Sequence, residues 1–165
     1  MPTLTTSSPK CRCCGAVVPE DFENCNALFH ALLEREYSDA AFGEAHLFTV
    51  DAYALQHCEE HGPRSNAFHL MRLCWLIEHD GNPSIRPVRQ GGRGFSNANE
   101  KSYEDFPFLA PPESRGELTV ANVVGAKTPD EHAAKARAWG ESVWNAWSVH
   151  HPWARAQVRE WFLKK

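Results

Sequence analysis

Apolar residues in this chain recur every three to four positions, and no long segment alternates between apolar and polar residues. A period of 3.6 residues is typical of an amphipathic α-helix, whereas a half-buried strand has a period of two. Such runs cover about residues 24–37, 44–57 and 66–81, and the third is apolar on nearly every side. The pattern therefore predicts an all-α protein in which more than half of the residues are helical and sheet is essentially absent.

The second half of the chain opens with a stretch of different character. From about residue 81 to 117 the sequence is rich in Gly, Pro, Asn and Ser, which favours a long irregular loop. A short helix is expected near 118–126, and Thr128-Pro-Asp-Glu should open a long one, because it combines an N-cap, a proline in the first turn and a capping-box glutamate. We expect Pro152 to end that helix near His150 and a last helix to follow. The fold class is therefore a helical bundle of about five to six helices.

The length of 165 residues is that of one globular domain. Residues 1–10, rich in Thr, Ser and Pro, have the composition of a flexible leader. We expect a single helical domain at 11–165, made of a knuckle (11–23), a three-helix core (24–80), a loop excursion (81–117) and C-terminal helices (118–165).

Charge and hydropathy narrow the classes of partner. The formal net charge is -4 and the pI is near 6.1, so the chain lacks the overall positive field that attracts nucleic acid or an anionic membrane surface. No window approaches the ~18 apolar residues of a membrane span, and no signal peptide is evident. We expect a cytoplasmic protein whose partner is an unidentified protein or small molecule.

A cysteine cluster near the N-terminus has the spacing of a zinc knuckle. Cys11 and Cys14 are separated by two residues and followed by Gly15, so a tight turn can direct two thiolates at one ion. In a reducing compartment, cysteines that cluster are more often free thiols or metal ligands than disulfides. One such pair supplies half of a tetrahedral site.

The other half can be sought from helix geometry. The first two predicted helices are about equally long and joined by a short turn, so they should lie antiparallel, with Cys25 beside His57. We therefore predict an N-terminal zinc-knuckle-like segment whose metal ligands are Cys11, Cys14, Cys25 and His57, and whose zinc is structural rather than catalytic. His69 or Cys58 is the alternative to His57 as fourth ligand, and reduced cysteines without metal are the alternative to a site.

The segment HLFTVDAYALQH carries an aspartate on the apolar side of a helix. At ~100° per residue Asp51 falls among apolar neighbours, and only Thr49, Ala52 and Gln56 remain for solvent. A buried carboxylate needs a cation or several donors to offset its desolvation. We expect a buried polar cluster of Asp51 with His69 and Arg72, which serves either to dock two helices or as part of a site.

These motifs resemble an uncharacterised bacterial family catalogued as domain of unknown function 5946. The resemblance rests on CRCCG, LEREYSDAAF, HLFTVDAYALQH, FLAPPESRGELTVANV and EHAAKARAWGESVWNAWSVHH, which together cover most of the chain. Arg12 and Cys13 stand where the family often has Pro and a variable residue, and Cys58 stands where it often has Pro. The resemblance implies a shared fold and supplies no activity.

Two functions from different classes fit these features, and whether the chain is an enzyme stays open. The first is a zinc-stabilised helical binding or regulatory module, favoured by the cysteines and by the lack of a GxSxG or HExxH motif. The alternative is a metal-dependent enzyme on a helical bundle, using Asp51, His69 and Arg72 near the metal. A nucleic-acid module built on the knuckle and the arginine-rich run at 84–94 comes third, because the net charge argues against it.

Overall fold

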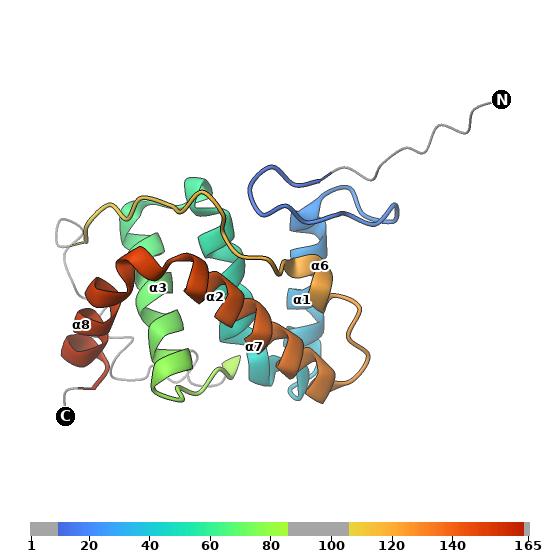
Figure 1. The fold of residues 1–165 in the computed structure, drawn as a ribbon. Coiled ribbons are helices and arrows are strands. Elements are labelled where there is room, and N and C mark those ends of the chain that lie inside the picture. The colour runs from blue at the N-terminus through green and yellow to red at the C-terminus, as the bar shows by residue number, and fades with distance from the viewer. Residues whose placement is uncertain (1–9, 86–105, 164–165) are drawn as a thin grey trace.

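The computed structural model describes residues 10–85 and 106–163, and this part of the chain is built from helices (Figure 1). Within these ranges there are six α-helices and no β-strand, so the all-α prediction is confirmed. The helices are α1 (Cys25–Ser38), α2 (His46–Gln56), α3 (Pro63–Glu78), α6 (Val120–Val123), α7 (Pro129–Ala146) and α8 (His151–Trp161). None of these helices is long and apolar enough to cross a bilayer.

Local sequence explains where the main helices begin. Asn24 caps α1 by accepting a hydrogen bond from the Ala27 N–H at 3.0 Å. Thr128 caps α7 through its hydroxyl, as the capping signal predicts. That helix ends at Ala146, earlier than expected, and a 3-10 turn at Ser148–His150 leads into α8, whose first turn contains Pro152.

Helix α2 lies at the centre of the bundle. It packs against α3 and α7, while α8 packs on the far side of α3 (Figure 1). The expectation that Thr49, Ala52 and Gln56 face solvent is wrong, because all three are fully buried. Helix α7 covers this side, and the Trp139 indole N–H donates to the Gln56 side-chain oxygen at 3.0 Å. A helix enclosed by its neighbours has no solvent face to predict.

The segment after residue 105 runs over the bundle without regular structure until α6 (Figure 1). It is held at several points: the His150 ring donates to the Ala110 carbonyl at 2.8 Å, and the Ser142 hydroxyl accepts the N–H groups of Glu117 and Leu118. The middle of the expected 81–117 loop, with its arginine run, lies outside the described residues. So does the expected leader, except for Lys10, which forms a β-bridge with Val17.

Candidate metal centre

The N-terminal segment forms the tight turn that the cysteine spacing predicts. The Gly15 N–H donates to the Cys11 carbonyl at 2.9 Å, and the Cys11 N–H donates to the Ala16 carbonyl at 2.9 Å. Gly15 adopts a positive φ of 76°, which side-chain-bearing residues rarely tolerate. The Ala16 N–H points at the Cys14 sulfur, 3.4 Å away. Backbone geometry thus places both sulfurs of the turn on the side that faces the bundle.

Two residues at helix ends complete the cluster. Cys25 is the first residue of α1, and its sulfur lies 3.3 Å from the Cys11 sulfur and 3.3 Å from His57 Nε2. His57 follows the last residue of α2, and its Nε2 lies 3.6 Å from the Cys11 sulfur. These three ligand atoms and the Cys14 sulfur all lie within 4.8 Å of one another. In a tetrahedral zinc site with Zn–S bonds of ~2.3 Å, two sulfurs are about 3.8 Å apart, so one ion fits this spacing.

The alternative fourth ligands lie elsewhere. The Cys58 thiol faces the Glu59 carboxylate, 3.7 Å away, and the His69 ring is bonded to Asp51. Within the described residues, only the predicted set of three cysteines and His57 gathers ligand atoms in this way.

A backbone contact fixes the orientation of His57. Its Nδ1–H donates to the Tyr53 carbonyl at 2.9 Å, so the lone pair of Nε2 is directed toward the cysteines. The Tyr53 ring stacks on the imidazole with centroids 4.0 Å apart, and its hydroxyl lies 3.8 Å from the Cys25 sulfur. The imidazole is therefore held in the tautomer and direction of a metal ligand.

One thiol of the cluster differs from the other two in the direction of its pKa shift. Burial alone would raise the pKa of Cys11, but hydrogen bonds from the Cys14 backbone and the Cys25 thiol, with further polar contacts, outweigh burial and lower that pKa to about 6. Burial and the neighbouring Cys11 sulfur raise the pKa of both Cys14 and Cys25. Three adjacent thiols cannot all lose their protons without a compensating charge, and a divalent cation would supply that charge.

The cluster can be reached from the surface. A depression of about 120 Å³ is lined by Cys11 and Cys25 together with Lys10, Val18, Glu23 and Asn24. Two of the four ligands therefore border an opening through which an ion could enter.

Comparison with known proteins identifies a family but no relative of known structure or function. The family model described as "Family of unknown function (DUF5946)" matches residues 9–148, which include all four residues of the cluster. The chain belongs to the DUF5946 family. A search of curated proteins and a search of solved structures found no significant match.

In this DUF5946 chain the polar cluster expected around Asp51 also forms. Asp51 is fully buried and accepts two hydrogen bonds from Arg72 Nε, at 2.8 and 3.0 Å, and a further contact from Arg72 Nη2. The His69 ring donates to the same carboxylate at 2.7 Å. This arrangement connects α2 to α3 and satisfies a carboxylate that would otherwise be costly to bury.

The structure contains a second buried carboxylate, which the sequence analysis does not predict. Glu36 in α1 is 1% exposed, and it accepts hydrogen bonds from the His132 ring at 2.8 Å, the Thr49 hydroxyl at 2.6 Å and the His46 ring at 2.8 Å. Burial opposes its ionisation, but these three donors together lower the pKa of Glu36. The sequence contains one sign of this burial: Glu36 follows Leu32 by four residues and therefore lies on the same apolar face of the helix.

Proposed function

We propose that this DUF5946 protein binds one zinc ion through Cys11, Cys14, Cys25 and His57. The observation that carries the proposal is the convergence of four ligand atoms, from three separate segments, within 4.8 Å. Three thiolates and one imidazole form a ligand set that suits zinc, whereas harder ions prefer oxygen ligands.

The proposed role of the ion is structural. Four protein ligands fill a tetrahedral shell, and no position is left for a substrate or a reactive water. The ion would join the N-terminal turn to the start of α1 and the end of α2, from which its ligands come. We place the protein in the cytoplasm, where the thiols stay reduced, and regard it as a binding or regulatory module for a protein or small molecule.

Elemental analysis of the purified protein tests the proposal. We expect about one equivalent of zinc per chain, and a loss of most of it in Cys14→Ser. Cys13→Ser is the matched control, because Cys13 lies in the same turn but outside the cluster, and this variant should keep its zinc. Less than about half an equivalent in the unmodified protein would contradict the proposal.

A second candidate is a metal-dependent enzyme that uses Asp51, His69 and Arg72. The observation in its favour is the short bond from a partly exposed His69 ring to a buried carboxylate, which resembles the pair that orients a general base. Metal coordination separates the two candidates: four protein ligands support the structural role, and three with a bound water support catalysis.

A further inference from the structure

Two histidines outside the cysteine cluster lie close together. His61 follows the 3-10 turn Cys58–Glu60 after α2, and His69 lies in α3. Their ring centroids are 5.8 Å apart, and the ring planes are tilted by 59° to each other. Two imidazoles that bind one ion at ~2.0–2.1 Å have centroids roughly 4.5–6 Å apart. The pair therefore has the spacing of two ligands of one metal ion.

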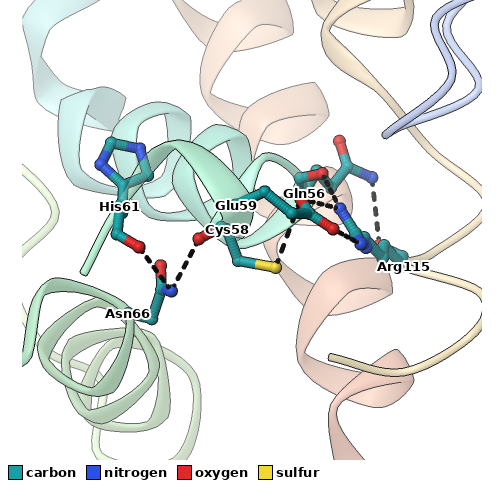
Figure 2. Close-up of polar contacts among 6 residues, drawn as sticks. All are labelled: Gln56, Cys58, Glu59, His61, Asn66 and Arg115. Atoms are coloured by element: carbon teal, nitrogen blue, oxygen red, sulfur yellow. Dashed lines mark hydrogen bonds and ion pairs between the residues drawn. The ribbon is translucent and has the colours of Figure 1, made fainter. Parts of the chain in front are cut away.

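The backbone of His61 is held by a network at the end of α2 (Figure 2). The Asn66 side-chain NH₂ donates to the carbonyls of Cys58 and His61, at 2.9 and 3.4 Å. The Arg115 guanidinium donates to the Gln56 carbonyl at 2.9 Å and fixes the preceding turn of chain. In Figure 2 the carbonyl of His61 faces Asn66 and its ring points away from Asn66. The network thus positions the His61 ring without occupying its nitrogens.

A buried carboxylate orients His69. The His69 Nδ1–H donates to Asp51 at 2.7 Å, and Asp51 also accepts two hydrogen bonds from Arg72 Nε. In the neutral ring the lone pair is then on Nε2. Histidines that bind metal ions almost always donate their other ring N–H to a carboxylate, a backbone carbonyl or a water, and this fixes the tautomer and makes the ligand more basic. Asp51 and His69 show this arrangement.

Both rings can be reached from solvent. Within residues 10–85 and 106–163, the unpartnered side-chain atoms that lack accessible surface belong to Asn66, His132 and Trp147. The ring nitrogens of His61 and the Nε2 of His69 also have no hydrogen-bond partner in these ranges, but they retain accessible surface. The His69 side chain is 14% exposed. An ion that arrives from water therefore meets free lone pairs.

The charges beside the pair are compatible with a bound cation. Arg72 forms an ion pair with Asp51, so its charge is balanced. The Glu60 carboxylate is exposed, adjacent to His61 in the sequence, and attracts positive charge to the His61 ring. Among these residues a divalent ion meets one acidic group and no unbalanced cation.

We propose that His61 and His69 bind a divalent transition-metal ion, separate from the ion of the cysteine cluster, with water in the remaining coordination positions. Imidazole ligands suit Zn²⁺, Ni²⁺ and Cu²⁺, whereas Mg²⁺ and Ca²⁺ prefer oxygen ligands. The two proposed sites share no ligand, so the histidine site does not rest on the cysteine centre. An ion with open positions beside Asp51 and Arg72 is also what the second candidate function requires.

A titration with Ni²⁺ alone tests the proposal on the full-length protein, purified without a histidine tag. Imidazole suits this ion, and its unpaired electrons broaden the NMR signals of nearby protons. We expect the ring signals of His61 and His69 to broaden together, at Ni²⁺ concentrations that leave the exposed His30 and His79 sharp. Simultaneous broadening of all four rings would overturn the proposal.

His61→Gln removes one ligand and leaves the bond between His69 and Asp51 in place. We expect His61→Gln and His69→Gln each to weaken Ni²⁺ binding at least about tenfold, because loss of a residue that only orients a metal ligand already costs about 10–100-fold. His79→Gln is the matched control, because His79 directly follows the same helix as His69 and is exposed, and it should leave the affinity unchanged. Ni²⁺ affinity that is unaltered in His61→Gln would overturn the proposal.

The outcome can be separated from that for the cysteine centre. Elemental analysis gives the zinc content of each sample before Ni²⁺ is added. A chain without zinc that still binds Ni²⁺ at His61 and His69 would contradict the proposed function and support the histidine site. A zinc-containing chain whose His61 and His69 signals stay sharp would do the reverse.

Discussion

At the scale of single residues, the structure contains two buried carboxylates that differ in how far the sequence reveals them. Asp51 lies on the apolar side of α2, which predicts its burial, and the next helix carries the expected cation, Arg72. The partners of Glu36 are 10, 13 and 96 residues away, and they come from α2 and α7. Periodicity shows which face of a helix is buried, but it does not show which distant side chains meet there.

The Glu36 cluster predicts a pH-dependent stability. The folded-state pKa of Glu36 lies below its ordinary value of 4.5, so the carboxylate contributes stability that is fully present above pH 4.5. This contribution is lost as the pH falls through the lower folded-state pKa. We expect Glu36→Gln to reduce the free energy of unfolding by about 1–3 kcal/mol at pH 7, because one or more buried donors lose a charged partner.

Urea unfolding between pH 3 and 7 measures this effect. The difference between the unmodified protein and Glu36→Gln should be constant above pH 4.5 and shrink below it. Glu34→Gln is the control, because Glu34 is exposed on the same helix and its replacement should change stability by less than about 0.5 kcal/mol. A difference that stays constant down to pH 3 would rule out the proposed contribution of the ionised carboxylate.

At the scale of elements, the sequence predicts where a capped helix begins better than it predicts what packs around that helix. Thr128 and Pro129 open α7 as expected, because a cap depends on residues within one turn. The burial of Gln56 could not be predicted in the same way, because it depends on Trp139 and on Arg115, both distant in the chain. The metal cluster is intermediate in how far the sequence predicts it. The local spacing identifies Cys11 and Cys14, and the expected antiparallel helix pair adds Cys25 and His57.

Gly140 shows how closely two elements approach. A Cβ placed on it would lie 2.7 Å from a ring carbon of Phe48 in α2 and 3.3 Å from a methyl carbon of Leu73 in α3. Overpacking costs about 1–3 kcal/mol. This exceeds the gain of about 1 kcal/mol in helix propensity from Gly to Ala. We therefore expect Gly140→Ala to lower the free energy of unfolding.

The matched control for Gly140→Ala is Gly125→Ala, because a Cβ at Gly125 meets nothing within 4 Å. Thermal unfolding should show a lower Tm for Gly140→Ala than for the unmodified protein. The Tm of Gly125→Ala should stay close to that of the unmodified protein. A higher Tm for Gly140→Ala would mean that Phe48 moves aside at low cost, and that α2 and α7 are less tightly packed than the structure indicates.

At the scale of the whole molecule, the proposed zinc ion and the apolar core share the task of holding the N-terminal turn. Ala16 and Val18 are buried in the core, 1% and 4% exposed, so the turn has more apolar support than the sequence alone suggested. These two side chains are small, Phe22 adds a partly buried contact with the core, and the metal ligands provide further attachment. Helices α3 and α8 pack against each other and contribute no ligand.

Removal of the ion should therefore loosen one part of the molecule first. We expect chelation to speed amide hydrogen exchange in residues 10–28, because metal binding and the folding of that segment are coupled. Exchange in α3 and α8 should change little, because their apolar contacts with each other do not involve the ion. Hydrogen-exchange mass spectrometry with and without a strong chelator measures both regions in one experiment. Faster exchange throughout the chain would mean that the ion supports the whole fold, and unchanged exchange at 10–28 would mean that Ala16 and Val18 hold the turn without it.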